Sequence, residues 1–453
     1  MQLPPVILFF LFFAGCSDFV EVDLPSSQLT STAVFQDKAT ATAAMTDIYA
    51  RVRDAGLLTG KSTGLSGQLG LYSDELAFYG SATNLSTQFY RNALLPAGKE
   101  TSDLWNAAYG QIYAANAMIL GLDRSATIPE ADKSQLKGEA IFIRALLHFY
   151  LLELYGSIPY ATATDYETNR RLPKLPAAEV YALIIADLEQ ATALLPEDYV
   201  SESRARVNSL AAKALLARVY LYAGLWAEAS NAASAVLNSQ QYHLEENIDN
   251  VFLNDGPETI WQLMAATPGG NTSEAGTFIF TVGPPPLSAL SLELLGAFGA
   301  GDLRKAHWTK EVTAATGSWS HAYKYKKTGN TGSSVEYSIV LRLAEQYLIR
   351  AEARAMQGEL IGAKEDLNAV RHRAGLGDTD AITAGEIAAA VLSERRLELF
   401  TEFGHRFFDL KRLGKLDTAL GYKPGWNSTD RNFPLPESEL LLNPNLAPQN
   451  EGY

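Results

Sequence analysis

Two segments of the chain repeat one pattern and decide the fold: AAKALLARVYLYAGLWAEASNAASAVL (211–237) and AEQYLIRAEARAMQGELIGAKEDLNAV (344–370). In both, apolar residues recur at helical spacing, and a central glycine is placed to end one helix before another begins. Small residues fall at identical offsets, namely Ala217, Gly224 and Ala229 in the first segment and Ala351, Gly358 and Ala363 in the second. Such residues at a helix crossing are typical of a tetratricopeptide repeat, although a generic helical bundle would share the periodicity.

Helical periodicity extends upstream of the repeat. Further helices are predicted over 104–122, 137–156 and 178–195. Residues 241–340 differ, because they carry Gly/Pro-rich stretches such as TPGGNTSEAG and VGPPPL between short apolar pieces. The predicted fold is therefore mostly α, with tetratricopeptide-like helical repeats and a loop-rich, irregular insertion region.

The overall composition excludes one large class of partner. The 453 residues carry a net charge of −14, with 47% hydrophobic and 19% charged residues. A nucleic-acid-binding chain needs clustered Lys and Arg to neutralise phosphates, so no nucleic-acid partner is expected. Aromatic residues are plentiful, with 21 Tyr, 19 Phe and 6 Trp. Most of them must form the core, but some could remain available for ligand stacking.

The N-terminus predicts a lipid anchor. Cys16, the single cysteine of the chain, directly follows the apolar run VILFFLFFAG (6–15), which is too short to span a bilayer. We interpret 1–15 as a lipoprotein signal peptide, Cys16 as the lipid-attachment residue and 16–30 as an acidic tether. The signal lacks an N-terminal Lys or Arg and has Phe13 where Leu is commoner. An ordinary secretory signal with an incidental cysteine is the alternative.

Five ordered segments between residues 137 and 453 resemble the signature blocks of the SusD/RagB family. They are IFIRALLHFYLLELYGSIPY, RLAEQYLIRAEARA, DLNAVRHRAGL, ERRLELFTEFGHRFFDLKR and FPLPESELLLNPNLAPQNEGY. The resemblance implies an N-terminal helical region over 31–240 and a C-terminal SusD/RagB region over 241–453, with 241–340 loop-rich. It also implies a surface-exposed outer-membrane lipoprotein of Bacteroidetes, anchored by acyl chains such as palmitate.

The same resemblance implies a role in nutrient uptake. Members of the family bind glycans, or in some cases peptides, and deliver them to a TonB-dependent transporter resembling SusC. They are not enzymes, so no catalytic residue, cofactor or metal ligand is expected. A peptide-binding member of the family is the first alternative, and a surface glycosidase is the second.

The glycosidase alternative rests on the stripe Glu394, Glu398 and Glu402, whose i, i+4 and i+8 spacing predicts one helical face. A retaining glycosidase needs two carboxyl groups about 5 Å apart, close to this spacing. Four arginines stand among the carboxylates, and ion pairing with them would oppose a general-acid role. These are Arg395, Arg396, Arg406 and Arg412. We therefore interpret the stripe as structural.

Sugar binding needs flat aromatic faces and fixed polar groups, and two loop regions offer them. The ligand-binding candidates are Tyr79, Asn84 and Tyr90 in the first region and Trp308, Trp319 and Tyr323 in the second, where His321 also lies. Family members place aromatic platforms in comparable regions, but these loops do not align residue by residue. Trp105 lies within a helical pattern and is expected in the core. Trp308 and Tyr325 could also belong to the core, and for Trp319 binding and packing are both open.

Overall fold

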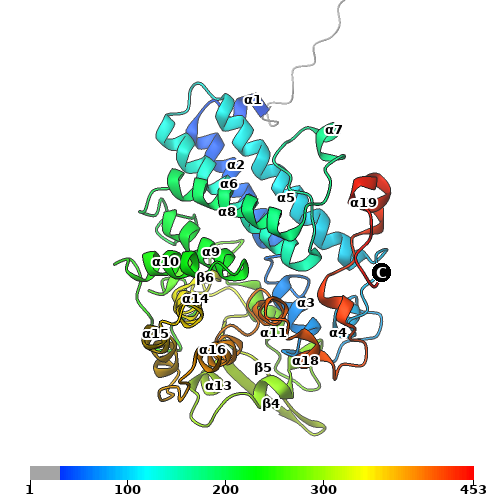
Figure 1. Ribbon diagram of the computed structural model, residues 1–453, viewed down its shortest axis with the longest axis vertical. Helices are drawn as coiled ribbons and strands as arrows, with labels where there is room; N and C mark the ends of the chain where they lie inside the picture. Colours follow the sequence, from blue (N-terminus) through cyan, green and yellow to red (C-terminus); the bar gives the residue numbers. More distant parts are fainter. Residues whose placement is uncertain (1–30) are drawn as a thin grey trace, which may run out of the picture.

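The computed structural model describes residues 31–453 and shows a long stack of helices above a smaller region of short strands and helices (Figure 1). The expected signal peptide (1–15), the attachment residue Cys16 and the tether (16–30) lie outside the described residues. Within 31–453, no helix combines the length and the apolarity needed to cross a membrane.

Helices dominate the first half of the described chain. Its elements are α1 (Ser31–Val34), α2 (Lys38–Asp54), α3 (Leu65–Tyr72), β1 (Leu76–Phe78), α4 (Ser86–Tyr90), α5 (Lys99–Arg124), α6 (Glu130–Tyr155), α7 (Tyr166–Asn169), α8 (Ala177–Leu194), α9 (Ser209–Tyr222) and α10 (Trp226–Leu237). The helices predicted over 104–122, 137–156 and 178–195 are confirmed as parts of α5, α6 and α8. Helix α6 packs against α2, α5, α8 and α9, so it is buried on every side from Gln135 to Tyr155, apart from Lys137.

The repeat is confirmed as two helical hairpins. Helices α9 and α10 form the first, and α14 (Leu343–Met356) and α15 (Leu360–Arg373) form the second. Gly224 and Gly358 have φ of +74° and +83° between the paired helices, a backbone conformation that glycine adopts without a Cβ penalty. Ala217 and Ala351 are fully buried. Helix α10 packs directly on α14, so the hairpins continue one stack although about a hundred residues separate them in sequence.

The second half of the chain adds short elements around this stack. They are β2 (Thr259–Leu263), α11 (Ser273–Phe278), β3 (Ser288–Leu290), α12 (Leu292–Leu295), α13 (Leu303–Trp308), β4 (Thr309–Ala314), β5 (Gly317–Ala322), β6 (Ser338–Arg342), α16 (Ala384–Glu398), α17 (His405–Arg412), α18 (Leu416–Leu420), the 3-10 turn η1 (Ser428–Arg431), α19 (Glu437–Leu442) and η2 (Pro444–Leu446). The strands form the antiparallel pairs β1–β3, β2–β6 and β4–β5.

The region 241–340 is more regular than the loop-rich prediction. It contains strands and helices of three to six residues, too short to show a clear periodicity in the sequence. The β4–β5 hairpin turns through Ala315 and Thr316, so it lacks the Asn-Gly or Asp-Gly pair that marks such turns. Two residues predicted to lie in loops therefore belong to regular elements, Trp308 to α13 and Trp319 to β5.

Candidate ligand-binding site

The structure brings together Tyr79 and Trp319, which are far apart in the sequence. Tyr79 follows β1, whose Phe78 pairs with Ser288 of β3. Trp319 lies on β5, which packs beside β3 and pairs with β4 through Val312. The two ring centroids are 6.3 Å apart at an interplanar angle of 86°, an edge-to-face contact. The sequence around neither residue shows this contact, because it forms through β3, which pairs with β1 and packs beside β5.

Backbone contacts hold this aromatic pair in place. The Trp319 indole is half-buried against Gly283, where an added Cβ would come within 2.4 Å of the ring. The backbone N–H of Tyr79 donates to the carbonyl of Leu287 at 2.7 Å, and the Tyr79 side chain is 43% exposed. The pair therefore presents a pre-positioned aromatic surface to solvent, which limits the side-chain entropy that a ligand would have to remove.

Tyr90 borders a second part of the same region. Its ring stacks on Phe78 at 5.9 Å and 29°, and it lines a cavity of about 550 Å³. Tyr422, which is 58% exposed, lines this cavity together with Arg91 and Glu293. Tyr422 was not among the predicted residues, because the segment GYKPGW (421–426) lies far from the other candidates in sequence and only the tertiary structure brings it here.

The remaining predicted residues of this region make contacts with neighbouring parts of the protein. The Asn84 side-chain oxygen accepts a hydrogen bond from the backbone N–H of Ser86 at 2.9 Å, so it stabilises its own turn at the surface. The half-buried Tyr323 ring lies beneath the ammonium groups of Lys310 and Lys326, at 5.0 and 5.5 Å. His321 is buried next to the Phe280 ring. Asn84 and Tyr323 stay candidates, but Tyr79 and Trp319 form the exposed pair.

The prediction that Trp308 contacts a ligand is wrong. Its side chain is 1% exposed, and its indole N–H donates to the carbonyl of Ile248 at 2.9 Å. Phe252 packs edge-to-face on the ring, and the charged ends of Lys324 and Arg373 lie 5.1 and 5.4 Å from its centroid. The alternative that placed Trp308 in the core is confirmed, as are the core positions of Tyr325 and Trp105.

The carboxylate stripe is buried and ion-paired. Glu398 accepts hydrogen bonds from the guanidiniums of Arg304, Arg342 and Arg373, all within the core. Burial acts to raise the pKa of Glu398, but these guanidiniums outweigh it and hold the pKa well below its usual range. A carboxylate held in this state cannot serve as a general acid, which supports the structural interpretation of the stripe.

Two details of that interpretation were wrong. Helix α16 ends at Glu398, and Glu402 lies in the following turn, where Thr401 has φ of +56°. The partners of the stripe also come from distant elements, whereas the arginines adjacent in sequence pair elsewhere. Arg395 pairs with Asp409, Arg396 and Arg406 pair with Asp74, and Arg412 pairs with Glu352 and Asp409. Sequence proximity is therefore a poor guide to ion pairing inside this core.

The two regions differ in what they can do chemically. The interior around Glu398 is closed and its charges are matched, so it stabilises the fold. The surface around Tyr79 and Trp319 exposes aromatic rings that can stack on the apolar faces of a neutral ligand. This surface is the candidate ligand-binding site.

Comparisons with known proteins agree with this architecture. Residues 18–221 match a family described as starch-binding and associating with the outer membrane, and residues 304–453 match the SusD family. SusD-like protein P2 of Formosa agariphila is 29% identical over 417 residues, which cover 78% of this chain and 80% of that protein.

Solved structures share the fold. A SusD superfamily protein from Bacteroides vulgatus superposes with a TM-score of 0.81 at 23% identity, covering 92% of this chain and all of the other. A laminarin-binding SusD-like protein superposes with a TM-score of 0.78 at 24% identity and the same coverage. With the helical stack, the ordered sequence blocks and both family matches in agreement, this chain belongs to the SusD family of outer-membrane-associated binding proteins.

Proposed function

We propose that this chain is a surface-exposed lipoprotein that binds a glycan through the Tyr79–Trp319 pair and delivers it to a SusC-like TonB-dependent transporter. The observation that carries the proposal is the exposed, pre-positioned aromatic pair at the junction of β1, β3 and β5. Stacking on such rings discriminates sugars by the orientation of their apolar C–H faces and requires no charge on the ligand.

One further observation favours a glycan over a peptide: a structural relative is described as binding laminarin.

The ligand class is tested by presenting the purified chain to an array of glycans and a parallel library of peptides. We expect retention on neutral polysaccharides with no increase in reducing ends. Binding confined to peptides would replace the glycan assignment, and the release of new reducing ends would reinstate the glycosidase.

The lipid anchor is tested separately in the native host. A Cys16→Ala variant should move from the outer membrane to the soluble fraction, and the wild type should incorporate labelled palmitate at Cys16. Membrane retention of the variant, together with no label on the wild type, would contradict the anchor.

Delivery to a transporter is tested by purification in mild detergent from the host. A large TonB-dependent transporter should co-purify with the tagged wild-type chain. Its repeated absence, with the chain folded and membrane-bound, would count against the delivery role while leaving glycan binding intact.

A further inference from the structure

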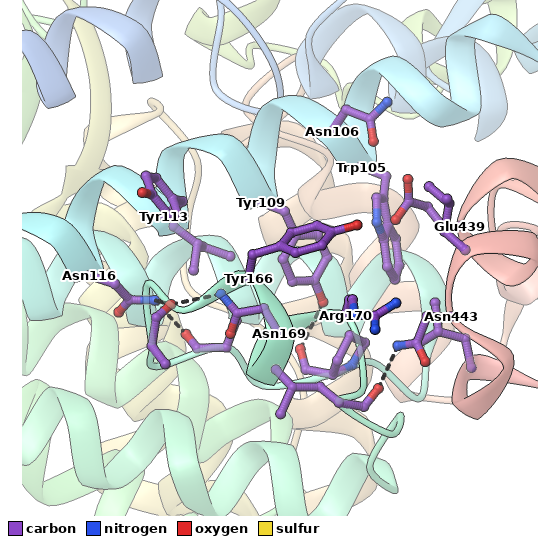
Figure 2. A pocket seen from close by; sticks show the side chains of 17 residues that line it. Trp105, Asn106, Tyr109, Tyr113, Asn116, Tyr166, Asn169, Arg170, Glu439 and Asn443 are labelled. Atoms are coloured by element: carbon purple, nitrogen blue, oxygen red, sulfur yellow. Dashed lines mark hydrogen bonds between the residues drawn. The ribbon is translucent and has the colours of Figure 1, made fainter. Parts of the chain in front are cut away.

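A separate groove lies on the helical side of the molecule, between α5, the segment 159–172 that contains α7, and α19 (Figure 2). Its volume is about 300 Å³, at the lower end of the range usual for small-ligand sites. Four aromatic residues line it: Trp105, Tyr109 and Tyr113 from α5, and Tyr166 from α7. Figure 2 shows Tyr166 extending from α7 toward the aromatic side chains of α5.

The α7 side of this groove is held firmly against the helical stack. Asn116 donates to the carbonyl of Ala161 at 2.9 Å, and the Tyr109 hydroxyl donates to the carbonyl of Pro159 at 2.8 Å. Asn443 donates to the carbonyl of Leu172 at 2.8 Å from the other side of the groove. The segment is therefore tied at both ends, so the backbone that carries Tyr166 is positioned before any ligand arrives.

The groove carries no net charge. Of the described residues that line it, Arg170 and Glu439 are charged, and they have opposite signs. Arg170 is also paired with Glu167 at 2.8 Å, outside the lining. Burial raises the pKa of Glu439 above its usual range, although a hydrogen bond from Trp105 opposes this shift. A phosphate, a nucleotide or an acidic sugar would find no excess positive charge here.

The uncharged polar groups of the lining are amides and hydroxyls. The amide residues are Asn106, Asn116, Asn169 and Asn443. Asn106 and the rings of Tyr113 and Tyr166 are exposed, so their polar groups are accessible from solvent. Flat aromatic faces combined with neutral donors and acceptors match a pyranose, which has apolar C–H faces and a hydroxyl rim.

We propose that this groove is a second carbohydrate subsite that takes a neutral oligosaccharide segment against the exposed rings of Tyr166 and Tyr113. The proposal rests on the proposed glycan-binding function, but it uses different elements from the Tyr79–Trp319 pair. If a glycan is long enough to reach both sites, binding at one site raises its effective concentration at the other. The overall affinity would then exceed the affinity of either site alone.

The test uses isothermal calorimetry and saturation-transfer NMR on the full chain, with laminarihexaose, cellohexaose and maltohexaose as neutral probes and hexagalacturonate as the acidic probe. The background is the double variant Tyr79→Ala/Trp319→Ala, in which the first site is impaired. We expect at least one neutral hexasaccharide still to bind, its affinity to fall at least fivefold when Tyr166→Ala is added, and hexagalacturonate not to bind.

The controls separate this proposal from the proposed function. Tyr166 is 69% exposed, so its truncation should leave the fold intact, and Tyr113→Ala provides a second variant on the opposite wall. Ile361→Ala removes an exposed side chain from α15, which lines neither site, and should change nothing.

Each contrary result has a distinct meaning. If the wild type binds a hexasaccharide that Tyr79→Ala/Trp319→Ala abolishes and Tyr166→Ala leaves unchanged, the second subsite is overturned and the proposed function stands. If no neutral hexasaccharide binds the wild type and the glycan array is blank, both are overturned. If Tyr166→Ala spares sugar binding but lowers transporter recovery, the groove is a protein contact and the carbohydrate assignment is wrong.

Discussion

Trp308 and Trp319 lie eleven positions apart in sequence and in opposite environments. Trp308 ends α13 inside a buried network of aromatic rings, guanidiniums and carboxylates, whereas Trp319 lies on β5 beside an exposed tyrosine. Both stretches mix aromatic, basic and small residues, and both were candidates for binding. An aromatic residue supports the fold or contacts a ligand according to the side of the element on which it lies. The comparison teaches that local composition does not reveal which side that is.

The largest effect should come from truncating the buried tryptophan. Trp308→Ala is expected to lower the free energy of unfolding by about 3–5 kcal/mol, because it leaves a large cavity next to Phe252. Trp319→Ala is the matched control and should cost about 1 kcal/mol, typical of an ordinary substitution. Denaturant unfolding of both variants measures the two free energies of unfolding. Equal losses of stability would show that the two tryptophans do not differ in their contribution to the fold.

Removing the central carboxylate should have a similar effect on the interior. Glu398→Ala is expected to cost about 3–5 kcal/mol, because the guanidiniums of Arg342 and Arg373 would be left buried without their shared partner. The exposed Glu311 of β4 offers a matched control, whose replacement by Ala should change stability by less than about 0.5 kcal/mol. A stable, active Glu398→Ala chain would mean that the network is dispensable.

A pH-dependent effect should arise where the interior meets the binding surface. Glu75 precedes β1, is fully buried, and has a pKa raised from 4.5 to about 7 by burial and by the nearby Asp74 carboxylate. Between pH 4.5 and 7 the folded chain retains a proton that the unfolded chain releases, so this residue lowers stability as the pH rises, by up to about 3 kcal/mol.

Glu75→Gln removes this titration. The stability of Glu75→Gln relative to the wild type should therefore rise between pH 5 and pH 8, as thermal unfolding of both chains at the two pH values measures. Glu274, whose pKa is also raised to about 7 by burial, will retain part of the dependence, and Glu274→Gln serves as the parallel variant. Identical pH profiles for wild type and Glu75→Gln would show that Glu75 is ionised throughout this range.

The smallest expected effect is on binding at the surface. Tyr79→Ala or Trp319→Ala should weaken binding of the glycan selected by the array by at least about 1 kcal/mol, as truncated interface aromatics commonly do. Calorimetry on folded variants measures the loss, and Glu398→Gln, which alters only the interior, should bind nearly normally if it folds. If Glu398→Gln alone lost binding, the carboxylate stripe and not the aromatic pair would be the binding site.

The sequence by itself determined the helices and the two helical hairpins. Apolar residues at helical spacing, with alanine at the crossings and Gly224 and Gly358 at the breaks, specify local structure through short-range geometry. The five ordered blocks were likewise sufficient to indicate the family. The sequence also indicated that the carboxylate stripe is structural, but it indicated the wrong partners, because the arginines next to the stripe in sequence pair with other carboxylates.

Only the tertiary structure decided which residues meet. The partners of Glu398 come from α13, β6 and α15, and Tyr79 meets Trp319 across β3, so both contacts join segments that no local pattern connects. The groove around Trp105 and Tyr166 is a third example, since a core prediction for Trp105 was right and still concealed its contact with a cavity. Periodicity reports which face of an element is apolar, whereas partners and exposure depend on long-range packing that a single sequence does not encode locally.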